Sequence, residues 1–216
     1  MAATDRVYLY GQVQRRLRTA RMRSFVEAFG VTADTRILDV GGDAFNWSLV
    51  DVRPRVTVLN MERPTEPLPD GMDFLIADGR ALPFADQSFD IVYSNSVIEH
   101  LGTRERQEEF AREIQRVGRT YYVQTPNRWF PFEPHLITPF VHYLPHRWQR
   151  AVYPYTVWGL VFRPTPAEMD ANYEQIRLLD RHEFASLFPD ASLITERMAA
   201  LAKSFIAQRT VPRGSS

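Results

Sequence analysis

The stretch with the clearest capacity for chemistry is Ile37 to Gly42, where an apolar run ends in a carboxylate and two glycines. The run is typical of a strand that is buried on both faces. Glycines let the backbone turn sharply and let a ligand approach it, and Asp39 places a carboxylate where the strand leaves the core. The stretch favours a nucleotide-like cofactor, although a strand followed by two glycines also occurs as a plain tight turn.

Polar residues also end the next predicted strands, which we place at Arg55–Met61, Phe74–Ala77 and Phe89–Tyr93 because of their apolar and β-branched residues. Strands separated by helices or short crossovers predict a parallel sheet, and ligands bind outside the carboxyl ends of its strands. We therefore expect one rim of the sheet to gather polar groups from four strands. These residues are Asp39, Asn60 with Glu62, Asp78, and Ser94 with Asn95.

Helical periodicity predicts the elements that position this rim. An apolar stripe predicts a helix from Tyr8 to Phe29, and Thr103–Val117 has a similar stripe that Gly118 would end. Asp180 is expected to cap a later helix together with Glu183. Further elements are a short helix at Phe45–Val50, strands at Arg36–Val40 and Tyr121–Gln124, and a final strand pair at Ser192–Glu196 and Ser204–Ala207. Arginines on the first helix (Arg15, Arg16, Arg18 and Arg23) fit either a solvated surface or a basic lid over the cofactor.

The composition limits the function classes. The 216 residues suit one domain, which we expect to span residues 1–209 with a frayed tail over 210–216. Lysine plus arginine equals aspartate plus glutamate, so we expect no binding to nucleic acid. The absence of cysteine excludes disulfides, thiolate catalysis and zinc bound by cysteine. No signal peptide or membrane-spanning run is evident, which predicts a cytoplasmic protein.

Aromatic residues and prolines crowd the segment from Pro126 to about Glu174. The segment is too long for an ordinary connection and too apolar for a disordered linker. We interpret it as a cap inserted over the rim of the sheet after the fifth strand. Such a cap suits an acceptor with an apolar part, such as an aromatic metabolite, an isoprenoid or a lipid-linked sugar. Dimerisation through the cap and peripheral membrane contact explain it equally well.

The stretch from Asp78 to Leu101 resembles the third and fourth motifs of the class I S-adenosylmethionine-dependent methyltransferases, in the small-molecule branch that is type 11-like. It has an acidic residue after a strand, a Leu-Pro-Phe turn, a Ser-Phe-Asp entry to the next strand, and then Glu-His-Leu. Motif order and spacing fit from Arg36 to Gln124. The segment from Thr125 to His135 is similar to a subset of bacterial methyltransferases of unsettled substrate.

The resemblance implies a Rossmann-like α/β sheet of seven strands, in the order 3-2-1-4-5-7-6 with strand 7 antiparallel and helices on both faces. It implies S-adenosylmethionine as cofactor. Asp39 and Gly41 would form the turn at its methionine and ribose, and Gly42 would let the backbone approach. Asp78 would accept the adenine amino group. The remaining implied contacts are Gly79 and Arg80 beside Asp78, main-chain groups of Ser94 and Asn95, and Phe45 or Trp47 packed either on the cofactor or in the core.

Two departures from the family pattern put the cofactor site in question. Asp43 and Phe45 stand where the family usually has glycines. Asn60 occupies the place of the carboxylate that grips the ribose hydroxyls, and Glu62 lies two residues later on the same face of the strand. A carboxylate accepts two hydrogen bonds better than an amide does, so we favour Glu62. The alternative is a weakened or lost cofactor site.

Methyl transfer is an in-line displacement in which alignment of the reactants, worth ~7–11 kcal/mol, outweighs a general base, worth typically ~10²–10⁴-fold. His100 is a candidate base, with packing beneath the cap as the alternative. Glu133 and His135 are candidates on the acceptor side. His142 and His146 fit surface or structural roles, and the histidines form no metal cluster with a carboxylate, so we expect no metal.

The sequence thus favours S-adenosylmethionine-dependent methyl transfer, at oxygen, to a small-molecule, lipid or lipid-linked sugar acceptor. A catalytically inactive cofactor-binding module is the alternative, with the aromatic cap as a surface that docks a protein or a membrane. A nicotinamide-dependent oxidoreductase would need the Gly-x-Gly-x-x-Gly fingerprint, which this chain lacks.

Overall fold

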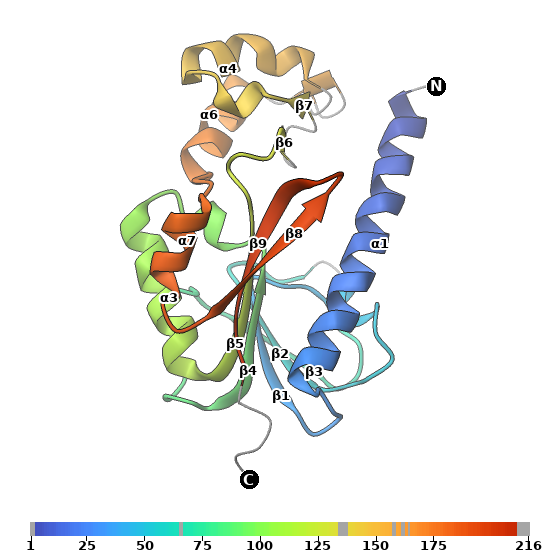
Figure 1. Ribbon diagram of the computed structural model, residues 1–216, viewed down its shortest axis with the longest axis vertical. Coiled ribbons are helices and arrows are strands. Elements are labelled where there is room, and N and C mark those ends of the chain that lie inside the picture. Colours follow the sequence, from blue (N-terminus) through green and yellow to red (C-terminus); the bar gives the residue numbers. More distant parts are fainter. Residues whose placement is uncertain are drawn as a thin grey trace. The chain divides into compact units, whose positions relative to one another are not determined.

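A sheet of seven strands organises the protein (Figure 1). The computed structural model describes residues 3–64, 67–133, 138–156, 159–160, 163 and 165–210. The strand order is β3-β2-β1-β4-β5-β9-β8, which confirms the predicted Rossmann-like order. The strands are β1 Arg36–Val40, β2 Arg55–Asn60, β3 Met72–Ile76, β4 Phe89–Asn95, β5 Gly118–Pro126, β8 Ser192–Met198 and β9 Leu201–Arg209.

The chain divides into two compact units. Unit 1 comprises Met1–Asn95, Glu113–Tyr122 and Arg209–Ser216, and unit 2 comprises Ser96–Arg112 and Val123–Gln208. The prediction of a single domain over residues 1–209 stays a prediction. Of the predicted tail, Thr210 is described and residues 211–216 lie outside the described residues.

In unit 1, β1 lies between β2 and β4 and is parallel to both. Its side chains are almost entirely buried, as expected for a central parallel strand. The register pairs Val40 with Leu59 in β2, and Asn60 with Ile76 in β3. Because parallel strands in register end at the same edge of the sheet, the polar residues that follow β1, β2 and β3 share one rim.

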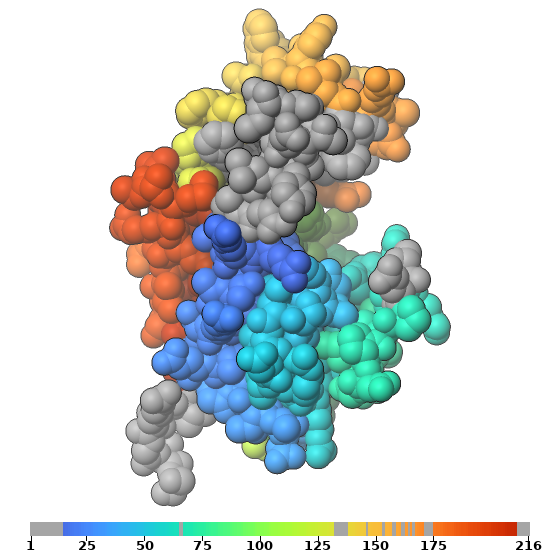
Figure 2. All heavy atoms as spheres, turned by 90° about the vertical axis from the view of Figure 1, so that its right-hand side faces the viewer, coloured from blue at the N-terminus to red at the C-terminus, as the bar shows by residue number. Residues whose placement is uncertain are grey.

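Helix α1, Ala3–Phe29, starts five residues earlier than predicted and packs on unit 1 through an aromatic cluster. Phe25 is fully buried, and its ring centroid lies 4.9 Å from that of Tyr93, 5.2 Å from that of Tyr122 and 6.2 Å from that of Trp47. Such aromatic pairs contribute about 1 kcal/mol each beyond area burial. Helix α1 also contacts α2, Ala44–Trp47, and Figure 2 shows the two regions (blue and cyan) side by side.

Unit 2 contains most of the remaining helices and the strand pair that precedes the end of the chain. Helix α7, Arg181–Leu187, begins with the predicted capping box, in which Asp180 accepts from the Glu183 N–H at 2.9 Å and Glu183 accepts from the Asp180 N–H at 3.1 Å. Strands β8 and β9 form the predicted antiparallel pair. The other elements are η1 Ile98–Leu101 and α3 Arg104–Val117, whose last turn belongs to unit 1.

The predicted cap segment, about residues 126–174, belongs to unit 2 and consists of short elements. Val141 and Met169 are buried together there, with Val152 packed against them. The elements are β6 Phe132–Glu133, β7 Thr138–Pro139, η2 Val141–Tyr143, α4 His146–Val152, η3 Tyr153–Tyr155 and α6 Pro166–Gln175. That this segment caps the sheet rim stays a prediction.

Candidate functional site

The loop after β1 is held by the neighbouring strand. Gly41 has φ of +75°, a conformation that favours glycine, and its N–H donates to the Leu59 carbonyl at 2.7 Å. The Asn60 side-chain amide donates to the Gly42 carbonyl at 3.3 Å, while its oxygen accepts from the Met61 N–H at 2.8 Å. Both ends of the Asn60 side chain are thus bonded to main-chain groups, which fixes the loop.

Asp39 is fully buried at the carboxyl end of β1. The Trp47 indole N–H donates to its Oδ2 at 2.8 Å, and Oδ1 has no hydrogen-bond partner among the described residues. Burial raises the pKa of Asp39 to about 7, the Trp47 bond opposes that rise, and the charge of Asp43 adds to it. The site therefore contains a carboxyl group that titrates near neutral pH.

Gly42 lies directly against this carboxyl group. A Cβ placed on Gly42 would be 2.1 Å from the Asp39 Cγ and Oδ2 and 2.2 Å from its Oδ1, distances that no real Cβ contact shows. The glycine at position 42 therefore makes room for the Asp39 side chain. Close approach by a ligand at Gly42 stays a prediction, whereas the contact with Asp39 is a reason for glycine that the structure itself gives.

Asp43 and Phe45 stand where the family pattern has glycines, and both belong to the start of α2. Asp43 Oδ1 accepts from the Phe45 N–H at 2.9 Å and caps the helix. The Phe45 ring is 37% exposed and has the Arg18 guanidinium 5.6 Å from its centroid. Trp47, by contrast, is 4% exposed within the aromatic cluster, so it packs in the core.

Asp78, which follows β3, carries the best-formed recognition geometry on the rim. Arg80 donates to both of its oxygens, from Nε at 3.1 Å to Oδ1 and from an amino nitrogen at 2.6 Å to Oδ2. The Arg80 main-chain N–H adds a bond of 2.9 Å to Oδ1 across Gly79. Both side chains are about one-third exposed. The carboxylate is therefore partly accessible, and both of its oxygens accept N–H donors of Arg80.

Ser94 and Asn95, at the end of β4, use their side chains within unit 1. Ser94 is buried and donates from Oγ to the Val40 carbonyl at 3.0 Å, which joins β4 to the loop after β1. The Asn95 side-chain oxygen accepts from the Arg21 guanidinium of α1. Arg21 was not among the predicted site residues, because its place in the helical stripe identifies a packing position and not the partner that it reaches.

Glu62 is the other predicted ribose ligand, and it differs from Asn60 in its exposure and in its hydrogen bonding. Its side chain is exposed beyond the end of β2, and it has no hydrogen bond or ion pair within the described part of the chain. Asn60 is half-buried and already bonded at both ends. The carboxylate near this strand end that is available to a ligand is thus Glu62.

The structure describes the three candidate catalytic residues to different extents, so it does not show whether they lie together. His100 is exposed in η1 of unit 2. Glu133 lies in β6 of the same unit, where its backbone alone is described, and His135 lies outside the described residues. The neighbouring Glu99 was not singled out, yet it is fully buried and its Oε2 accepts from the Thr125 hydroxyl at 3.1 Å. Within the described residues, no cluster of histidine and acidic side chains could hold a metal ion.

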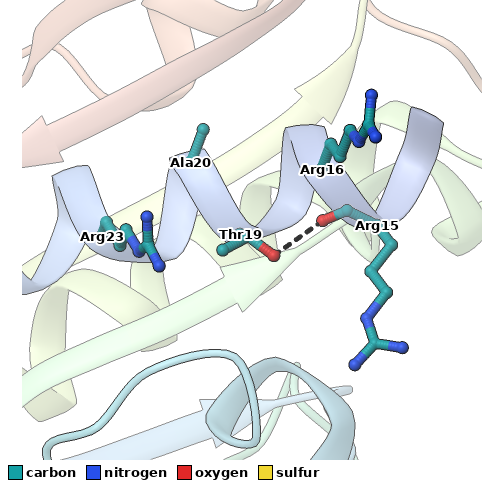
Figure 3. Close-up of a pocket in the computed structure, with 5 residues that line it drawn as sticks. All are labelled: Arg15, Arg16, Thr19, Ala20 and Arg23. Atoms are coloured by element: carbon teal, nitrogen blue, oxygen red, sulfur yellow. Dashed lines mark hydrogen bonds between the residues drawn. The ribbon is translucent and has the colours of Figure 1, made fainter. Parts of the chain in front are cut away.

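The arginines of α1 line a hollow on that helix (Figure 3). Its described lining residues are Arg15, Arg16, Thr19, Ala20 and Arg23. Thr19 donates to the Arg15 carbonyl at 2.9 Å, so its hydroxyl is used within the helix. Figure 3 shows the Arg15 and Arg16 side chains pointing away from each other. Guanidinium groups that diverge from one helix favour a solvated surface over a site that converges on an anion.

The fold is Rossmann-like, with a glycine turn after β1 and an acidic residue after β3. Residues 34–120 match the family described as "Methyltransferase domain". This segment, which holds every predicted cofactor residue, is therefore an S-adenosylmethionine-dependent methyltransferase domain of class I. The resemblance inferred from the Asp78–Leu101 motifs is confirmed.

Solved structures share the fold at low sequence identity. A Haloferax volcanii protein in complex with a methyltransferase activator has a TM-score of 0.56 and 15% identity over 92% of this chain and 91% of its own. The 1,6-didemethyltoxoflavin-N1-methyltransferase of Burkholderia thailandensis, with its substrate and S-adenosylhomocysteine bound, has a TM-score of 0.55 and 14% identity, covering 97% and 87%. A protein from an antibiotic biosynthesis pathway of Anabaena variabilis has a TM-score of 0.49 and 16% identity, and the match covers 82% of this chain but 64% of that one. No protein of curated function matches the sequence significantly.

Proposed function

We propose that this protein transfers the methyl group of S-adenosylmethionine to an oxygen of a small-molecule, lipid or lipid-linked sugar acceptor. The observation that carries the proposal is the Asp78 carboxylate, which is partly accessible after β3 inside the methyltransferase segment and accepts N–H donors on both oxygens. The exocyclic amine of adenine is such a donor. In this proposal the protein acts in the cytoplasm. None of the described helices has the length and apolar character needed to cross a membrane.

The residues of unit 1 fit the cofactor by their chemistry. Gly41 and Gly42 would let the cofactor come close to the main chain after β1, Glu62 offers a carboxylate for the ribose hydroxyls, and Asp78 offers one for the adenine amine. Ser94 and Asn95, whose side chains are committed elsewhere, would contribute through main-chain groups. S-adenosylmethionine, when bound, supplies a methyl group already activated on a sulfonium. The chain's main contribution is then orientation, with His100, Glu133 and His135 proposed on the acceptor side.

Asp78→Ala is expected to weaken binding of S-adenosylmethionine by roughly 10- to 100-fold, because hydrogen bonds to a charged group contribute about 1.5–3 kcal/mol. Titration calorimetry with S-adenosylmethionine and S-adenosylhomocysteine measures this. Asp34→Ala is the matched control, because it removes an exposed carboxylate of unit 1 outside the predicted cofactor site and should leave binding unchanged. Absence of wild-type binding at high micromolar cofactor would overturn the cofactor assignment.

Glu62→Gln is expected to weaken cofactor binding by roughly tenfold, the value of one charge-assisted hydrogen bond, with an unchanged free energy of unfolding because the side chain is exposed. Asn60→Ala should instead affect stability. It removes two bonds to the main chain, so we expect it to lower the free energy of unfolding by about 1–2 kcal/mol. Calorimetry and urea unfolding on both variants separate the two roles. If Glu62→Gln binds the cofactor as tightly as the wild type, the ribose is held elsewhere.

The acceptor is found by following the label from labelled S-adenosylmethionine into fractions of a cell lysate. Transfer to an organic-solvent fraction supports a lipid or lipid-linked acceptor, and transfer to a small polar fraction supports a soluble metabolite. The second candidate function, an inactive cofactor-binding module, is favoured by Asp43 and Phe45 at the glycine positions. It predicts cofactor binding without label transfer to any fraction.

A further inference from the structure

Unit 2 exposes a contiguous group of large aromatic side chains. Trp129 is 61% exposed, Phe140 59% and Tyr143 40%. The Tyr143 ring centroid lies 6.1 Å from that of Trp129 and 6.3 Å from that of Phe140, so the three rings are neighbours. The Arg128 guanidinium lies 5.3 Å from the Trp129 ring. Exposed aromatic groups of this size are uncommon on monomers and mark interaction sites.

Helix α4 reverses the usual burial of its side chains, because a polar residue is buried and an aromatic residue is exposed. Gln149 is buried and donates to the carbonyls of His142, at 3.3 Å, and Leu144, at 2.8 Å. The adjacent Trp148 is 55% exposed and follows the exposed Arg147. A short helix that turns an amide inward and a tryptophan outward is not explained by packing of its own unit. Its outer face suits an environment that accepts both an indole and a guanidinium.

The charge of this segment differs from that of the whole chain. Lysine plus arginine equals aspartate plus glutamate at 26 each over the chain. Residues 127–164 contain a single acidic residue, Glu133, against four arginines. The arginines are Arg128, Arg147, Arg150 and Arg163. Arg150 is paired with Asp170 of α6 at 3.3 Å, and Arg128 and Arg147 are exposed. The surface therefore combines aromatic rings with arginines that have no ion pair to any side chain described in the structure.

We propose that the aromatic–arginine surface (Arg128, Trp129, Phe140, Tyr143, Arg147 and Trp148) docks unit 2 onto an anionic lipid bilayer. Tryptophan and tyrosine have apolar rings with a polar edge, which favours the boundary between headgroups and acyl chains. Arginines beside them are attracted to anionic headgroups. A symmetric contact with a second copy would instead bring the arginines of both copies together, which costs energy. The surface contains no residue of the candidate cofactor site.

Flotation of the full-length protein with vesicles of phosphatidylcholine and phosphatidylglycerol at 3:1 tests the proposal, with pure phosphatidylcholine in parallel. We expect binding to the anionic vesicles that weakens at high salt. Arg128→Gln/Arg147→Gln should lower the partition coefficient by roughly 20-fold or more, since each arginine near an anionic surface contributes about fivefold. Trp129→Ser/Trp148→Ser should lower it on both vesicle types.

The matched control is Leu201→Ser/Arg106→Gln, which removes an exposed apolar side chain and an exposed arginine elsewhere in unit 2. This control should bind vesicles as the wild type does. Failure of the wild type to bind anionic vesicles at low salt overturns the proposal. So does self-association that the Trp129→Ser/Trp148→Ser variant abolishes while vesicle binding is absent, a result that assigns the surface to a second copy. Neither assay uses cofactor or acceptor, so the outcome is independent of methyl transfer.

Discussion

Gly42→Ala is expected to lower the free energy of unfolding by about 3 kcal/mol and to disturb the loop after β1. The new Cβ would stand 2.1 Å from the Asp39 carboxyl group. That group is fully buried and bonded to Trp47, so it has little room to move. Overpacking of a core costs about 1–3 kcal/mol, and a clash with a fixed buried group belongs at the upper end. Urea unfolding measures the loss.

A second glycine separates this clash from ordinary backbone strain. Gly30 has φ of +60°, and a Cβ placed on it would meet nothing within 4 Å. Gly30→Ala should therefore cost about 1 kcal/mol, the strain of a left-handed residue alone. Gly42 has no such φ, so its larger loss would come from the contact itself.

A double-mutant cycle identifies the partner. Asp39→Ala removes Cγ and both oxygens, the atoms that the new methyl group would meet. In that background Gly42→Ala should cost less than about 1 kcal/mol, so the cycle should show a coupling energy of about 2 kcal/mol. Equal losses in both backgrounds would show that Gly42 is needed for some other contact.

The elements of unit 1 follow closely from the sequence because their apolar runs are short, continuous and bounded by turn residues. Strand β1 has the predicted bounds, and β2 ends one residue earlier than expected.

The capping box at Asp180 and Glu183 is a local pattern, so its three-residue spacing was sufficient to predict it. Helix α1 begins at Ala3 and not at Tyr8, because apolar periodicity does not reveal a helical turn without a stripe.

The hydrogen-bond partners of the site side chains could not be predicted from the sequence, because they depend on the fold. Trp47 reaches Asp39 from the following helix, and Arg21 reaches Asn95 across 74 positions of sequence. Strand patterns predict where a polar residue lies on the rim, but not which partner has already taken its hydrogen bonds. Asn60 illustrates this, because its amide is bonded to the Gly42 carbonyl, a use that only the packing of two strand ends produces.

Asp39→Asn is expected to change how stability depends on pH. The folded-state pKa of about 7 lies above the ordinary value of 3.8 because burial disfavours the charged carboxylate. The folded protein then binds a proton that the unfolded chain releases between about pH 4 and pH 7. The contribution of Asp39 is therefore fully present below about pH 4 and is lost as pH rises to 7. The loss is roughly 4 kcal/mol for a shift of this size.

Asparagine stays neutral at every pH, and its oxygen can still accept from the Trp47 indole. We expect the variant to be close to the wild type near pH 4, to gain on it between pH 4 and 7, and to be more stable by several kcal/mol at pH 8. The difference between the two urea-unfolding curves, measured from pH 4.5 to 8.5, isolates Asp39 because other groups titrate equally in both proteins. A difference that does not vary with pH would mean that Asp39 titrates in its ordinary range.

Asp90 offers a control of opposite sign. Although burial acts to raise the pKa of Asp90, bonds from the Arg36 main chain and guanidinium lower it overall. Its contribution is present above the ordinary pKa and is lost as pH falls, so Asp90→Asn should reduce stability at neutral pH and less so in acid. Trp47→Phe acts on Asp39 itself, because the indole bond favours the ionised carboxylate. Its removal should raise the folded-state pKa of Asp39, so that the loss of stability extends to higher pH, which the same unfolding series would detect.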